Sequence, residues 1–186
     1  ALAGFSMGGS IILKYLGVHG SNLPEEIIAG VAVSTPCHLE TCSERLDWGL
    51  NRIYRKRFLD QLIPKIIAKE KQYPGLFDLT KIKDIKKMRD FDEFYSAPAN
   101  GLSTADEFYK YGSSIYYMDG IKLPTLLLNA NNDPILSPLS YPVEIAEDSD
   151  YIFLEIPKQG GHVGFSQKSA IPWHEVRLCE FLGSIA

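Results

Sequence analysis

A serine between glycines is the first feature of this chain that could do chemistry. Ser6 lies in Gly4-Phe5-Ser6-Met7-Gly8-Gly9, which fits the pattern Gly-x-Ser-x-Gly. In that pattern the serine sits on a strained turn between a strand and a helix, and glycines let the backbone pass closely on both sides. We expect Ser6 to be a nucleophile, with the Met7 N–H at the helix start facing a developing oxyanion. The alternative is a tight turn that holds a structural serine.

A serine hydroxyl is a weak nucleophile without a base, so the histidines come next. The chain has four: His19, His38, His162 and His174. His162 lies in a Gly-rich loop directly after an apolar run, and a loop beyond the carboxyl end of a strand is where a base can approach Ser6. We therefore predict His162 as the general base. We expect His19 and His38 to be solvated, and His174 to have a surface or packing role in a helix.

The third member of such a set is an acid that orients the imidazole. Asp133 follows the apolar run Leu126–Ala130 and precedes His162, which gives the chain order Ser, Asp, His. Its rivals precede strands and would lie at the wrong end of the sheet; they are Asp119, Asp148 and Asp150. We predict Asp133 as the acid, and the alternative is an Asx-turn ahead of the proline that follows.

The elements that must position these residues alternate between strand and helix. Short apolar runs predict strands at residues 1–5, 27–34, 126–130 and 151–156. Helical spacing predicts helices at 7–16, ending at Gly17, at 142–147 and at 173–182, the last with Val176, Cys179 and Phe181-Leu182 on its apolar side. This alternation predicts an α/β fold with a mostly parallel sheet and helices on both faces.

Residues 37–120 break that alternation, because they are long, charged and helical in pattern. We expect helices at 44–72, 81–90 and 104–118, with Pro64 interrupting or kinking the first. We interpret this stretch as a helical lid inserted into one α/β domain of residues 1–186, and the alternative is an extra helical layer. Within it, Tyr54-Arg55-Lys56-Arg57-Phe58 favours a solvated basic helix face over a membrane or nucleic-acid contact. The tyrosines at 109, 111, 116 and 117 favour helix packing over an acyl pocket.

Composition excludes some classes of function. The formal net charge of −4 gives no basic field for nucleic acid. No apolar run approaches the roughly 20 residues of a transmembrane helix, and no signal-peptide pattern opens the chain, so we expect a cytoplasmic protein. The three cysteines are Cys37, Cys42 and Cys179. We expect reduced thiols, with a Cys37–Cys42 bridge left open.

Taken together, five segments give the chain a family resemblance. They are Gly4 to Gly9, Arg89-Asp90-Phe91-Asp92, Tyr109 to Ser114, Asn129 to Pro134, and Gly160-Gly161-His162-Val163-Gly164-Phe165. In this order the chain resembles the α/β-hydrolase superfamily, and within it the YheT-like branch of medium-chain acyl esterases and abhydrolase-domain lipid esterases. The resemblance implies a Ser–Asp–His hydrolase of small-molecule acyl esters that uses no metal and no organic cofactor.

The chain departs from that family at its start. Ala1-Leu2-Ala3 reads as the end of a strand. The resemblance therefore leads us to expect that the family's N-terminal half, with the loop that supplies a second oxyanion donor, is not part of this sequence. Loss of one such donor typically costs about 10²–10³ in rate. We therefore expect a fragment that is unstable and nearly inactive by itself. Two alternatives to an esterase stay open: an acyltransferase that uses the same triad, and a non-catalytic binding protein of this fold.

Overall fold

The computed structural model describes residues 1–185 and divides the chain into two compact units. The first, which we call the sheet unit, comprises Ala1–Leu39 and Gly112–Ala186. The second, the helical unit, comprises Glu40–Tyr111, so its bounds fall inside the 37–120 stretch that the sequence sets apart. Each unit has its own core.

The sheet unit is built on four parallel strands in chain order, at the positions of the four predicted apolar runs. They are β1 (Leu2–Phe5), β2 (Gly30–Val33), β3 (Thr125–Leu128) and β4 (Ile152–Glu155). Every residue of β2 and β3 is buried, as expected for strands covered on both faces. Because all four run in the same direction, their carboxyl ends meet at one edge of the sheet.

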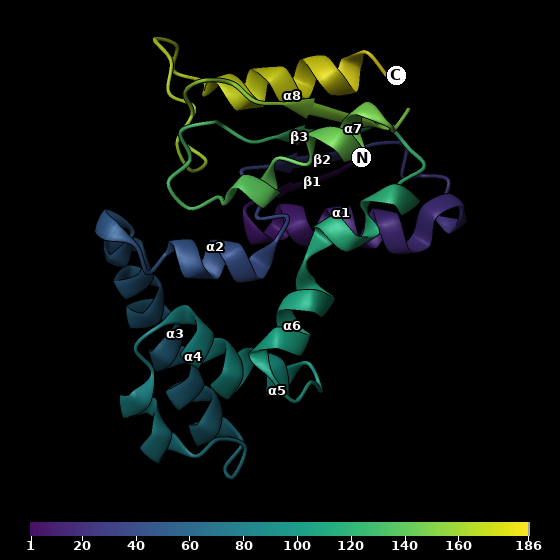
Figure 1. The fold of residues 1–186 in the computed structure, drawn as a ribbon. Helices are drawn as coiled ribbons and strands as arrows, with labels where there is room; N and C mark the ends of the chain where they lie inside the picture. Colours follow the sequence, from purple (N-terminus) through teal and green to yellow (C-terminus); the bar gives the residue numbers. More distant parts are fainter. Residues whose placement is uncertain (186) are drawn as a thin grey trace. The chain divides into compact units, whose positions relative to one another are not determined.

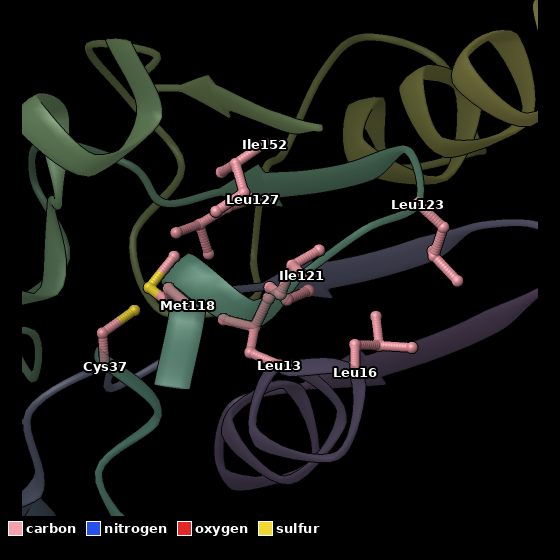
Figure 2. Close-up of a cluster of buried hydrophobic side chains, with 9 residues drawn as sticks. Leu13, Leu16, Cys37, Met118, Ile121, Leu123, Leu127 and Ile152 are labelled. Atoms are coloured by element: carbon pink, nitrogen blue, oxygen red, sulfur yellow. The ribbon is translucent and has the colours of Figure 1, made fainter. Parts of the chain in front are cut away.

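Side chains alternate between the two faces of the sheet and build a core on each. On one face, Ala32 and Leu127 pack with Leu13 and Leu16 of α1 (Met7–His19) and with Met118 of the 3₁₀ helix Ser114–Gly120; Figure 2 shows this cluster. The helix α7 (Val143–Glu147) adds Ile145 to the same cluster.

The opposite face is covered by α8 (Trp173–Gly183), so α1 and α8 lie on opposite sides of the sheet (Figure 1). Val31, Leu126 and Leu128 pack there against Phe181. The predicted apolar side of this helix was wrong in part, because Val176 and Cys179 are exposed. The side that packs carries His174, Leu178 and Phe181, at the spacing of one helical face, and Ile185 packs against the same core just after the helix ends.

The predicted stop of α1 at Gly17 was also wrong, since the helix continues to His19. Gly17 is needed for a different reason. An added Cβ there would overlap the main chain of Tyr117, so the glycine lets α1 approach the segment that precedes β3.

The helical unit contains more and shorter helices than the three that were predicted. They are α2 (Leu39–Arg45), α3 (Arg52–Gln72), α4 (Met88–Phe91), a π-helical turn (Asp92–Ser96), α5 (Ala97–Ala99) and α6 (Ala105–Gly112). Short 3₁₀ helices complete the two units at Gly20–Asn22, Gly49–Asn51, Leu79–Asp84 and Pro138–Ser140. Gly49, at φ 51°, breaks the first predicted helix. Pro64 does not end α3, because it is exposed and water can reach the carbonyl that it leaves unbonded.

A buried carboxyl stands at the centre of the helical unit. Asp92 accepts hydrogen bonds from the Ser96 hydroxyl at 2.6 Å and the Tyr109 hydroxyl at 2.9 Å, and the Tyr109 oxygen lies 2.9 Å from Ser43 Oγ. Burial raises the pKa of Asp92 against the lowering effect of these hydrogen bonds. Tyr109 therefore packs within the helical unit, and it connects α6 to α2 and to the π-helical turn.

Two further findings concern the whole described chain. None of the helices within residues 1–185 combines the length and the apolar character needed to cross a bilayer. No disulfide joins any pair of the three cysteines, and Cys37 and Cys42 are buried.

Candidate active site

Ser6 stands on a strained turn at the carboxyl end of β1. Its φ of 50° lies in the left-handed region of backbone conformations, which residues other than glycine rarely adopt. Its N–H donates to the Val33 carbonyl at 2.8 Å, and α1 begins at the next residue. A Cβ on Gly4 would lie 2.5 Å from the Gly8 carbonyl oxygen, so this glycine is required by close backbone approach.

Within residues 1–185, close approach requires the first of the motif's two glycines and not the second. A Cβ added to Gly8 would meet no atom of residues 1–185 within 4 Å. The neighbouring Gly9 is the tight position instead, because its Cβ would overlap the Thr35 side chain.

The structure brings the three predicted side chains into one hydrogen-bonded row. His162 Nδ1 lies 2.8 Å from Asp133 Oδ2, and His162 Nε2 lies 2.9 Å from Ser6 Oγ. Because a carboxylate can only accept, the proton belongs on Nδ1, and this leaves Nε2 to accept from the serine hydroxyl. The Asp133 side chain is fully buried and that of His162 is 16% exposed, so the row runs from the interior to the surface.

The Asp133 side chain also forms an Asx-turn, which the sequence offers as its alternative role. Its Oδ1 accepts a hydrogen bond from the Ile135 N–H at 2.9 Å, which is an Asx-turn, while its Oδ2 faces His162. The Asx-turn and the contact with His162 are therefore compatible. One oxygen fixes the carboxylate and the other is aimed at the imidazole.

Two residues that the sequence reasoning missed hold the loop that carries His162. Asn132 Oδ1 accepts from the N–H groups of Gly160 and Gly161, at 2.9 and 2.8 Å. Ser34 Oγ accepts from the Val163 N–H at 2.9 Å. Ser34 ends one predicted strand and Asn132 follows another, and a polar side chain at the carboxyl end of a parallel strand is the signal that could have identified them.

The backbone at this edge of the sheet is strained in several places. Positive φ values occur at Ser34 (51°), Val163 (64°) and Phe165 (41°), in addition to Ser6. For the β-branched Val163 such a conformation is especially unfavourable. Strain of this kind persists only where surrounding contacts impose it, and here the Ser34–Val163 hydrogen bond is one of those contacts.

The other three histidines lie outside the row. His19 ends α1 and is exposed, and its ring centroid lies 4.5 Å from that of Tyr15. His38 Nε2 lies 3.0 Å from the Tyr116 hydroxyl oxygen. His174 is buried between Phe5 and Phe165, with ring centroids 5.6 and 5.2 Å away, and desolvation lowers its pKa against the opposing effect of Glu175.

The arrangement can transfer a proton and stabilise charge. The imidazole can accept the Ser6 proton while the buried carboxylate stabilises the imidazolium that forms. Met7 is the first residue of α1, so its N–H has no partner within the helix and is available to an anion. Within residues 1–185, no group of three or more His, Cys, Asp or Glu side chains is placed to hold a metal ion.

Comparison with known proteins identifies the family. The family model for the alpha/beta hydrolase fold matches residues 1–169. The chain belongs to this family, which confirms the resemblance drawn from its motifs and the predicted fold class.

Among curated proteins, the chain is 30% identical over 189 residues to "Putative esterase YheT" of Escherichia coli, covering 98% of this chain and 54% of that protein. It is also 30% identical to two proteins of Saccharomyces cerevisiae. One is medium-chain fatty acid ethyl ester synthase/esterase 2, with 96% of this chain and 44% of that protein covered. The other is a monoacylglycerol lipase, with 97% and 41% covered. The chain thus spans about half the length of the curated relatives it matches, or less.

Solved structures support the fold alone. An esterase of Pyrococcus furiosus aligns with a TM-score of 0.53 at 19% identity, over 98% of this chain and 52% of the other. An alpha/beta fold family hydrolase of Bacillus anthracis aligns with a TM-score of 0.54 at 14% identity, over 99% of this chain and 66% of the other.

Proposed function

We propose that this chain carries the nucleophile, base and acid of a serine hydrolase that cleaves carboxylic acyl esters. The observation that carries the proposal is the row Asp133–His162–Ser6, with separations of 2.8 and 2.9 Å, at a serine held at φ 50°. The names of the relatives favour an ester as the substrate, since they include an esterase, an ester synthase/esterase and a monoacylglycerol lipase.

In the proposed reaction the proton of Ser6 passes to His162, and Asp133 stabilises the charge that forms. Ser6 Oγ attacks the ester carbonyl as its proton passes to His162 Nε2, and Asp133 stabilises the imidazolium. The Met7 N–H donates to the oxyanion. The alcohol leaves with the proton from His162, and water, activated by the same imidazole, then releases the acid and restores Ser6.

The test measures hydrolysis of p-nitrophenyl esters of graded acyl length by the full-length protein. Ser6→Ala is expected to lower kcat by at least about 10⁴-fold, because the acyl-enzyme cannot form. The matched control is Ser21→Ala, at an exposed serine in the 3₁₀ helix after α1, which should keep the full rate. Equal rates in the wild type and Ser6→Ala would refute the proposal.

A second candidate is acyl transfer to an alcohol, which the printed name of the yeast synthase/esterase favours. The acyl-enzyme would be the same, and an alcohol would take the place of water. Product analysis with and without added ethanol separates the two. Ethyl ester that rises with ethanol at the expense of free acid indicates a transferase, and free acid alone indicates a hydrolase.

A further inference from the structure

Large apolar side chains stand out into solvent at the start of α3. Trp48 is 75% exposed, Leu50 82% and Ile53 67%, and Tyr54 next to them is also exposed. Single exposed apolar residues are ordinary on protein surfaces, but four within seven residues concentrate exposed apolar side chains in one short segment. We call the segment from Trp48 to Arg57 the Trp48 surface.

The exposed apolar residues lie on a different side of α3 from the residues that pack in its core. Ile53, Tyr54 and Arg57 lie within one turn of each other on one side of α3, and Leu50 precedes them in the 3₁₀ helix Gly49–Asn51. The residues that α3 buries are Leu59 and Ile66, which fall on the other side and pack with Ile85 and Phe91. The helix therefore already has its packed side, and the exposed stripe is additional.

The charge around the patch differs in sign from that of the whole chain. Residues 45–57 contain five basic residues and one acidic residue, Asp47, in a chain with a net charge of −4. Two of the five basic residues are already paired, Arg55 with Asp47 at 2.5 Å and Lys56 with Asp60 at 2.6 Å. Arg52 and Arg57 are exposed beside the apolar stripe.

We propose that the Trp48 surface docks on an anionic lipid bilayer. Trp48, Leu50 and Ile53 enter the interface between headgroups and acyl chains, and the surrounding basic side chains contact acidic headgroups. Tryptophan and tyrosine beside arginine and lysine are the residues that membrane interfaces favour. The proposal goes beyond ester hydrolysis and does not depend on it.

Two other occupants fit the surface less well. A nucleic acid would use the basic and aromatic residues, but it has no use for Leu50 and Ile53 at the centre of the patch. A second copy of the chain would bring the exposed arginines of two such surfaces together, and facing like charges oppose association.

The experiment is co-sedimentation of the full-length protein with vesicles of phosphatidylcholine alone or with added phosphatidylglycerol. The wild type should sediment with the anionic vesicles, and added salt should weaken this binding. A triple variant that combines Trp48→Ser, Leu50→Ser and Ile53→Ser should have a vesicle–water partition coefficient at least tenfold lower. Arg57→Glu should lower it by about fivefold or more. The matched control replaces two exposed apolar residues elsewhere in the helical unit, Tyr73→Ser with Leu76→Ser, and should bind like the wild type.

The proposal is overturned if the wild type does not bind anionic vesicles. It is also overturned if the triple variant binds them as strongly as the wild type. A triple variant with an unfolding temperature several degrees below that of the control shows a surface packed against another part of the protein. A wild-type dimer that the triple variant abolishes shows a self-interface, and retention on RNA in place of vesicles shows a nucleic-acid surface. Ser6→Ala must bind vesicles like the wild type, so a failed esterase assay leaves this test unaffected.

Discussion

The Ser34 hydroxyl oxygen accepts a hydrogen bond from the Val163 N–H at 2.9 Å, and so ties the end of β2 to the loop that carries His162. The two residues are 129 positions apart in the chain. The bond holds Val163 in a backbone conformation that a β-branched residue does not adopt by itself. Ser34 is therefore a positioning residue in the proposed mechanism, one residue removed from the imidazole.

We predict that Ser34→Ala lowers kcat for a short-chain p-nitrophenyl ester by about tenfold, since losing this part-buried hydrogen bond is expected to cost about 1 kcal/mol. KM should change little, because Ser34 does not contact substrate in the proposed mechanism. The matched variant is Ser34→Gly, which accepts the positive φ but lacks the hydroxyl. A Gly variant with full activity would show that only the backbone conformation matters.

Asp133→Asn should separate the acid role from the structural one. The amide oxygen can still accept from Ile135, so thermal unfolding should stay close to that of the wild type. The amide cannot stabilise an imidazolium and favours the wrong tautomer, so kcat should fall by about 10⁴-fold. Circular dichroism melts and steady-state rates on the same preparation make the comparison. A variant with native stability and a rate within tenfold of the wild type would remove Asp133 from the mechanism.

The two glycines of the serine motif should respond differently to alanine. Gly4→Ala places a Cβ 2.5 Å from the Gly8 carbonyl oxygen, and main chain cannot move aside as a flexible side chain can. Gly4→Ala should therefore lower the unfolding temperature and abolish activity. Gly8→Ala meets no atom of residues 1–185 within 4 Å and replaces a helical glycine, so stability should stay equal or rise by about 0.5–1 kcal/mol. Equal damage from both substitutions would contradict the close approach at Gly4.

The buried His174 predicts a pH dependence of stability. Desolvation lowers its pKa in the folded protein below the ordinary value of 6.5. As pH falls through 6.5 the unfolded chain takes up a proton that the folded chain does not, so this group removes stability until the lowered folded pKa is reached. His174→Phe, which keeps a ring between Phe5 and Phe165, should lose less stability than the wild type between pH 7 and pH 5. Urea midpoints at the two pH values measure the difference, and identical losses would contradict the burial of His174.

The sequence predicts the sheet and the row of three side chains because their signals are local. Fully buried parallel strands read as continuous apolar runs, and Ser6, Asp133 and His162 each lie in a short motif directly after such a run. Ser34 lies outside these motifs, and Asn132 lies in the same segment as Asp133 but was assigned no role. The roles of both appear only when two loops distant in the sequence meet.

The predictions for α8 and for the end of α1 were wrong because the roles of His174 and Gly17 also depend on contacts in the folded chain. His174 was not assigned to the apolar side of α8 because an imidazole reads as polar, although its ring packs between two phenylalanines. Gly17 suggested a helix end, whereas it serves a close contact with Tyr117 that only the folded chain reveals. The lid role of the helical unit remains a prediction.

The most direct measurement of the central claim is covalent labelling by a fluorophosphonate, located by peptide mass spectrometry of the full-length protein. A labelled Ser6, with a labelling rate reduced at least about 10³-fold in His162→Ala, is the predicted result, because the serine hydroxyl needs the imidazole to react. An unlabelled protein would favour a non-catalytic binding role. Label on another residue, or equal rates in His162→Ala, would contradict the proposed nucleophile and base.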